Sequence, residues 1–218
     1  MNSRRTIRKP EQLGFGDLLA NAERVNERTK FARAAAHLPG AMDEALPFYR
    51  ALLTRHDAAM RAADAEVTMA LRNEAHLLAE KLNDFEPGIL AEEDSPGRVL
   101  DRLTRAVAGA VPLWGQSGNF VVTLDAMQIG IDLHGIFALA SFTYPLLGFC
   151  AHAVDWNKPF LSETGYRSFC AIGGDLAPDF TPDRFVREVI AAHIKREMKG
   201  KLRKIKPEHR PRGAGTAG

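Results

Sequence analysis

From residue 119 to residue 134 the sequence reads NFVVTLDAMQIGIDLH, and this stretch decides the fold class. Apolar and polar residues alternate in both halves, so that Ile129, Ile131 and Leu133 share one face of the second half. An alternation of period two is typical of β-strands with one buried face. Because the Asp125-Ala126 connection between the halves is short, the stretch predicts a β-hairpin.

Other segments extend this hairpin into a small antiparallel sheet followed by a helix. Residues 135–140 and 149–154 are predicted as further strands. A helix is predicted from Pro182, because Thr181 is a good N-cap and proline suits the first helical position. Gly200 weakens this helix, and residues 201–206 are expected to extend it as a basic, solvated end.

The first third of the chain has helical periodicity. Apolar residues of the segment 15–37 fall largely on one face, and Leu38-Pro39-Gly40 ends this helix. Residues 41–84 carry a longer apolar stripe, which predicts either one long helix or two helices broken near residues 62–64. Because no Gly or Pro marks the break, one long helix is favoured.

Together these patterns predict an α+β protein with an N-terminal helical hairpin or bundle, a small antiparallel β-sheet and a C-terminal basic helix. The predicted divisions are a flexible basic arm (1–12), the helical hairpin or bundle (13–84), a linker with a short helix (85–110), an α+β unit with the C-terminal helix (111–206) and a disordered tail (207–218).

Basic side chains gather at both ends of the 218-residue chain. Residues 1–9 have a net charge of +4, residues 195–212 have +7, and the body between them has −9. This asymmetry suggests contact with DNA or RNA through the termini, the alternative being two solvated tails. No run of about 18 apolar residues and no secretory signal is found, so we expect no membrane partner and a cytoplasmic location.

Motifs for known chemistry are missing from the sequence. It has no P-loop, no dinucleotide-binding fingerprint, no His-Glu-x-x-His and no Gly-x-Ser-x-Gly, and no cofactor is expected. Cys150, His152, Cys170 and His134 are chemically suited to zinc but lack the usual paired spacing, so we expect two free thiols and no metal. An enzyme centred on His152, Glu163 and Arg167 is kept as an alternative.

The segment 154–169, VDWNKPFLSETGYRSF, combines aromatic, charged and hydrogen-bonding side chains. On a loop containing Pro and Gly, Tyr166 and Arg167 can present a stacking ring and a guanidinium to a polyanion. The predicted contact residues are Trp156, Lys158, Glu163, Tyr166 and Arg167, with electrostatic attraction from Lys199, Lys201, Arg203, Lys204 and Lys206. The alternative is a structural loop, in which Glu163 pairs with Arg167 while Trp156, Phe160 and Phe169 fill the core.

Four parts of the sequence, residues 12–19, 38–40 with 45–50, 111–116, and 153–156 with 159–169, resemble a family of conserved hypothetical proteins. Its members are carried in alphaproteobacterial genomes, often on plasmids and integrative elements. The resemblance covers nearly the whole chain and implies no activity, so no catalytic residue follows from it. It implies a non-enzymatic accessory protein of a mobile element. The basic ends of the chain suggest that such a protein acts by contact with nucleic acid or a nucleoprotein. The alternative is a protein-binding module that uses the helical hairpin, for example an inhibitor of a host defence complex.

Overall fold

The computed structural model describes residues 15–138, 147–172 and 178–211. The chain divides into two compact units, Met1–Leu38 and Pro39–Gly218. In the first unit the described residues form α1 (Phe15–Ala34). The predicted basic arm and most of the predicted tail lie outside the described residues.

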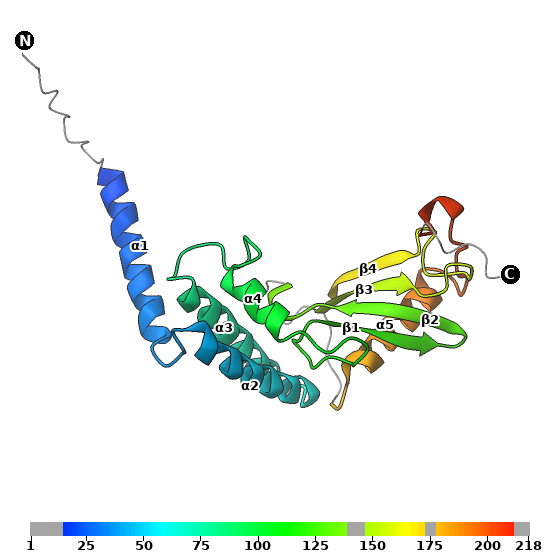
Figure 1. Ribbon diagram of the computed structural model, residues 1–218, viewed down its shortest axis with the longest axis horizontal. Coiled ribbons are helices and arrows are strands. Elements are labelled where there is room, and N and C mark those ends of the chain that lie inside the picture. The colour runs from blue at the N-terminus through cyan, green and yellow to red at the C-terminus, as the bar shows by residue number, and fades with distance from the viewer. Residues whose placement is uncertain (1–14, 139–146, 173–177, 212–218) are drawn as a thin grey trace, which may run out of the picture. The chain divides into compact units, whose positions relative to one another are not determined.

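The second unit is α+β, as the sequence predicts (Figure 1). Four antiparallel strands form one sheet in the order β1-β2-β3-β4. The described elements of the second unit are, in chain order, α2 (Met42–Arg61), α3 (Ala65–Leu82), α4 (Pro96–Leu103), β1 (Gly118–Leu124), β2 (Met127–Leu133), the short 3₁₀ turn η1 (Ile136–Ala138), β3 (Leu147–Ala153), β4 (Tyr166–Ile172), α5 (Pro182–Arg196) and a second 3₁₀ turn η2 (Pro207–His209). None of the helices described is long and apolar enough to cross a membrane.

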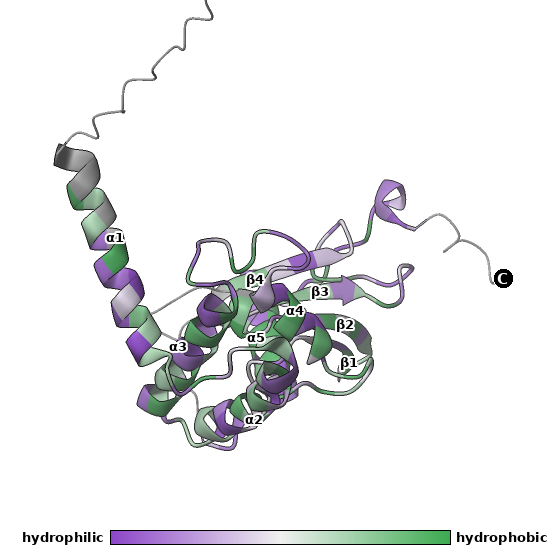
Figure 2. Ribbon diagram, turned by 60° about the vertical axis from the view of Figure 1, so that its left-hand side comes forward, coloured by the Kyte–Doolittle hydropathy of each residue, from purple (hydrophilic) through white to green (hydrophobic). Residues whose placement is uncertain are grey.

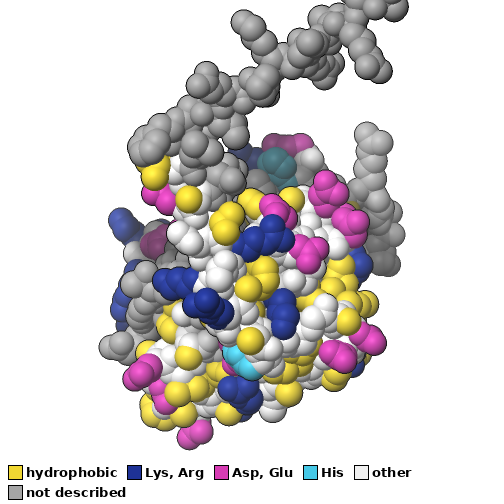
Figure 3. Space-filling model, turned by 90° about the vertical axis from the view of Figure 1, so that its left-hand side faces the viewer, with side chains coloured by type: hydrophobic (Ala, Val, Ile, Leu, Met, Phe, Trp, Pro, Cys, Tyr) yellow, Lys and Arg dark blue, Asp and Glu magenta, His cyan; other side chains and the backbone are white. Residues whose placement is uncertain are grey.

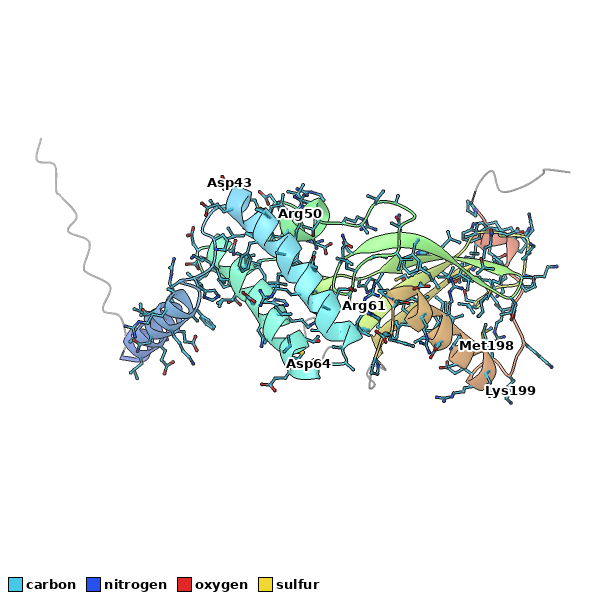
Figure 4. All side chains as sticks on the ribbon, turned by 90° about the horizontal axis from the view of Figure 1, so that it is seen from below. Asp43, Arg50, Arg61, Asp64, Met198 and Lys199 are labelled. Carbon is cyan, nitrogen blue, oxygen red and sulfur yellow. The ribbon has the colours of Figure 1, made fainter. Side chains whose placement is uncertain are left out.

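The helical stripe of residues 41–84 is two helices, so the preference for one long helix was wrong. Ala63 takes a left-handed conformation with φ of 56°, which a continuous α-helix does not accommodate. The side chain of Asp64 then accepts a hydrogen bond of 3.0 Å from the backbone N–H of Val67 and caps α3. Figure 4 shows α2 running from Asp43 past Arg50 to Arg61, and α3 beginning just after Asp64 and lying beside α2.

The predicted hairpin is confirmed as β1 and β2, joined through Asp125 and Ala126. Apolar side chains on one face of the sheet are buried, and Figure 1 shows α5 behind the sheet. Ile131, Phe149 and Val186 lie in this core, each no more than 1% exposed. The opposite, outer face carries mainly polar side chains, such as Asp132, His152 and Ser168, and the exposed Val121.

Three local predictions were wrong. Residues 166–172 form the edge strand β4, although they were predicted as part of a loop; in Figure 2, β4 has purple and pale segments, whereas β1 and β2 are mostly green. Ile136–Ala138 is a 3₁₀ turn where a strand was predicted. Residues 201–206 are extended, and residues 207–209 form a turn in place of the predicted disorder.

The end of α5 explains the extended segment that follows it. Lys199 and Gly200 both have positive φ, 53° and 75°, so the helix cannot continue through them. The N–H of Gly200 bonds back to the carbonyl of Ile194 at 2.9 Å, which closes the helix end. The chain therefore leaves the helix at this point, and Figure 4 labels Met198 and Lys199 there.

Candidate functional site

The residues after α5 form a fixed basic segment, which we define as residues 199–206. Phe160 and Arg203 form an isolated antiparallel bridge, each donating its backbone N–H to the other's carbonyl at 2.8 Å. Lys206 N–H donates to the carbonyl of Glu163 at 2.9 Å. Ile205 is 1% exposed and anchors the segment in the core. The cations of this segment are therefore held by backbone pairing to the loop 154–165.

Within the part of the chain that the structure describes, most cations of the basic segment form no ion pair with an acidic side chain. Lys206 is the exception: its Nζ lies 2.7 Å from Glu163, and this hydrogen bond and charge lower the pKa of the Glu163 carboxyl. No ion pair among the described residues involves the exposed side chains of Lys199, Lys201, Arg203 and Lys204. Lys158, on the neighbouring loop, lies 3.5 Å from Asp155 but remains largely exposed.

The five predicted contact residues do not share one surface. Tyr166 is exposed on the outer face of β4, whereas Arg167, the next residue along the strand, lies on the opposite face. There the Arg167 guanidinium lies 3.6 Å from Glu197, so the predicted Glu163–Arg167 pair was wrong. The guanidinium carbon also lies 5.9 Å from the centre of the Phe169 ring.

The aromatic residues of the loop are mainly structural. Phe160 is 1% exposed and Phe169 is 9% exposed, as the structural alternative predicted. Trp156 is half-buried against the core, and its ring covers Gly165 so closely that a Cβ there would clash with it. Gly165 also has φ of 70°, so this position requires glycine on two grounds.

A polar cluster on the outer face of the sheet surrounds Cys150. Its Sγ lies 3.0 Å from the hydroxyl of Tyr166 and 3.6 Å from Nε2 of His134. The hydrogen bond to Cys150 raises the pKa of the Tyr166 phenol, and burial lowers the pKa of the His134 imidazole. Cys170 lies nearby on β4, with its Sγ 3.0 Å from the Ser168 hydroxyl.

The three residues proposed for an enzyme are not brought together, and of the four proposed metal ligands only Cys150 and His134 are in contact. His152 Nε2 lies 2.7 Å from Asp132 on the outer face, whereas Glu163 pairs with Lys206 and Arg167 with Glu197. Within the ranges the structure describes, no group of three His, Cys, Asp or Glu side chains is placed to hold a metal ion. Both cysteines are free.

The Cys150 cluster was only partly visible in the sequence. Period two along the strands places Asp132 with His134, and Cys150 with His152, on one face. Tyr166 and Ser168 join them only because residues 166–172 are a strand, with Ser168 opposite Cys150 and Tyr166 opposite His152. The mistaken loop prediction therefore concealed half of the cluster.

Comparison with known proteins finds two relatives, both Escherichia coli proteins named Protein KlcB. One is 31% identical and the other 34% identical, each over 139 residues that make up 63% of this chain. The matched region covers 29% of the first protein and 33% of the second, so the chain spans about a third of the length of these relatives. Both come from Escherichia coli, so the expected alphaproteobacterial origin is not shown. No family model and no solved structure matches the chain.

Proposed function

We propose that the protein is a non-enzymatic accessory protein of a mobile genetic element that contacts nucleic acid through its basic segment. One observation carries this proposal: four exposed cations that form no ion pair among the described residues stand on a segment held by backbone pairing, and only one of them, Arg203, has its charge felt by an acidic group, Glu163. Lysine and arginine on such a surface attract phosphates irrespective of base sequence. The mobile-element setting rests on the sequence resemblance alone.

The neighbouring loop and helix add to the positive charge of this region. Lys158 lies on the loop that pairs with the segment, and Lys195 and Arg196 are exposed in the last turn of α5. On the face drawn in Figure 3, by contrast, dark-blue basic side chains are interspersed with magenta acidic and yellow hydrophobic ones. The concentration of cations after α5 therefore favours a polyanion over a protein partner held by the helices.

Replacing Lys201, Arg203 and Lys204 by Gln in one variant is expected to weaken nucleic-acid binding at least about tenfold at roughly 50 mM salt. The dependence of log K on log salt should also become shallower by about two to three units, because fewer counterions are released. The bridge to Phe160 uses only the backbone of Arg203, so the fold should be unchanged. Fluorescence anisotropy with a labelled oligonucleotide at several salt concentrations measures both quantities.

A matched control removes the same charge elsewhere. Arg28, Lys30 and Arg33 are exposed on α1, and replacing all three by Gln should leave the affinity within about twofold if the basic segment is the contact. Equal losses in the two triple variants would attribute binding to net charge alone. No binding by the unmodified protein at low salt would reject the proposal.

The second candidate function is thiol chemistry at Cys150, favoured by its contacts with His134 and Tyr166. A base within hydrogen-bond reach activates a nucleophile, and burial keeps the His134 imidazole neutral and able to accept a proton. We therefore expect iodoacetamide to alkylate Cys150 several-fold faster than Cys170, although Cys170 is the more exposed thiol. Mass spectrometry of the labelled peptides gives both rates. Labelling in the order of exposure, unchanged in a His134→Ala variant, would exclude an activated thiol.

A further inference from the structure

The basic segment also forms one wall of a pocket. The pocket has a volume of about 290 Å³ and lies between the β1–β2 turn, the loop 154–165, α5 and the segment itself. Its apolar walls come from all four parts: Leu124 and Met127, Pro159, Ile194, and Leu202. The rest of the lining consists of two charged residues, Lys158 and Asp125, and two small ones, Ala126 and Gly200.

Pocket-lining residues and basic residues alternate along the same stretch of the chain. Gly200 and Leu202 line the pocket, whereas Lys199, Lys201 and Arg203 occupy the positions between and beside them. Lys199 and Gly200 lie in the turn that ends α5, and the residues after them are extended and held at Arg203 by its bridge to Phe160, so the positions of these residues are fixed. A ligand that places a flat apolar group between Gly200 and Leu202 therefore brings its anionic parts close to lysine side chains.

We propose that the pocket receives one unstacked base of a single-stranded nucleic acid, whose phosphates lie on Lys158 and the cations of the basic segment. This inference rests on the proposed function and names its ligand class. A pocket near the lower end of the usual range for small ligands has room for a single ring system. The bases of a duplex are stacked inside it and cannot enter, whereas those of a single strand can turn outward.

The charges of the pocket fit this orientation of the ligand. The Asp125 carboxylate repels phosphate but accepts hydrogen bonds from the amino groups that nucleobases carry on their edges. Lys158 is exposed for most of its length and stands on the same rim, where it attracts the backbone of the strand. The base is therefore expected inside the pocket and the phosphates outside it.

The test compares a labelled single strand with the duplex of the same sequence, at equal salt, by fluorescence anisotropy. The unmodified protein is expected to bind the single strand about tenfold more tightly. An Ala126→Trp variant, which fills the pocket from the β1–β2 turn, should remove this preference and leave duplex binding unchanged. Gln128→Trp is the matched control, since it adds the same ring to the same hairpin at an exposed position that does not line the pocket.

The outcomes separate this inference from the proposed function. A preference for the single strand that Ala126→Trp abolishes and Gln128→Trp preserves supports the pocket. Equal binding of both forms, or equal weakening of both by Ala126→Trp, overturns the pocket while the polyanion contact stands. Absence of binding to either form rejects the proposed function itself. Thermal unfolding followed by circular dichroism shows whether each variant is folded, and a second variant, Leu202→Thr, repeats the test without added bulk.

Discussion

Replacing Trp114 by Ala is expected to lower the free energy of unfolding by about 3–5 kcal/mol, the range found when large aromatic side chains are removed from packed cores. Trp114 is 1% exposed and belongs to the main core cluster. Its ring meets that of Phe185 edge to face, with 5.5 Å between the ring centres. Such a loss is a large part of the 5–15 kcal/mol that a typical domain possesses.

Trp114 links α2 to the core through its backbone, which the alanine variant keeps, and through its indole ring, which the variant removes. Its backbone N–H donates to Oδ1 of Asp57 at 2.9 Å, and its carbonyl accepts from Nδ1 of His56 at 2.9 Å. Both partners are on α2. The indole N–H donates to the carbonyl of Phe180, just before α5, at 2.8 Å. Removing the ring therefore leaves a cavity and a buried carbonyl without its donor.

Two further variants separate the contribution of the indole hydrogen bond from that of the buried apolar area, and compare Trp114 with a less buried tryptophan. Trp114→Phe keeps most of the apolar area and should cost about 1–3 kcal/mol for the unpaired Phe180 carbonyl. Trp156→Ala is the matched control, because Trp156 is half-buried and should lose less than half as much as Trp114. Urea unfolding followed by circular dichroism gives the three values. Equal losses at Trp114 and Trp156 would contradict the role of Trp114 as the link between α2 and the core.

The sheet was predictable where the local pattern and the turn agreed. Residues 127–134 alternate clearly, residues 119–124 are rich in β-branched and aromatic residues, and two turn residues join them, so both strands of the hairpin followed from the sequence. The edge strand β4 was missed because three exposed residues in a row, Tyr166, Arg167 and Ser168, precede the buried Phe169 and give little alternation. Its pairing with β3 depends on tertiary contacts, which the local sequence does not show.

The helical break shows a different limit. Residues 62–64 contain no Gly or Pro, and the left-handed conformation of Ala63 is not one that an alanine favours by itself. The signal that remained was Asp64, a good N-cap three residues before Val67. A capping residue inside a periodic stretch was thus the better guide to the break than the missing Gly or Pro.

The basic segment was predicted in charge but not in conformation. Its cations could be counted in the sequence, whereas its extended form depends on the bridge between Arg203 and Phe160, which are distant in sequence. The pocket beside it depends on the same bridge, since Leu202 precedes Arg203 directly. A candidate site built from backbone pairing of this kind leaves no motif in the sequence.

Acidification from pH 6.5 to pH 4 is expected to remove about 3 kcal/mol of stability through His56 alone. His56 is fully buried, its Nδ1 donates to the Trp114 carbonyl, and its Nε2 has no hydrogen-bond partner among the residues described. Burial lowers its pKa from 6.5 to about 4; the bond to Trp114 and the charge of Asp57 oppose this, and the charge of Arg72 adds to it.

The free energy of unfolding falls on acidification because the folded and unfolded states bind different numbers of protons at His56. Between pH 6.5 and pH 4 the unfolded chain has a protonated His56, whereas the folded protein keeps it neutral. The unfolded state therefore binds more protons, and the free energy of unfolding falls as the pH falls through this window. Above pH 6.5 both states are neutral at His56, and below pH 4 both are protonated, so the contribution is constant outside the window.

Other groups titrate in the same range, so a matched variant is required. Burial also lowers the pKa of His76, which adds to the loss, whereas burial raises the pKa of the Asp101 carboxyl, which opposes it. In His56→Asn the side-chain amide can still donate to the Trp114 carbonyl but does not titrate. The free energy of unfolding, measured in urea from pH 7 to pH 4, should therefore fall less steeply in His56→Asn by about 3 kcal/mol over that window. Parallel curves for the two proteins would mean that His56 is hydrated in the folded state. The description of a buried hydrogen bond between α2 and Trp114 would then be wrong.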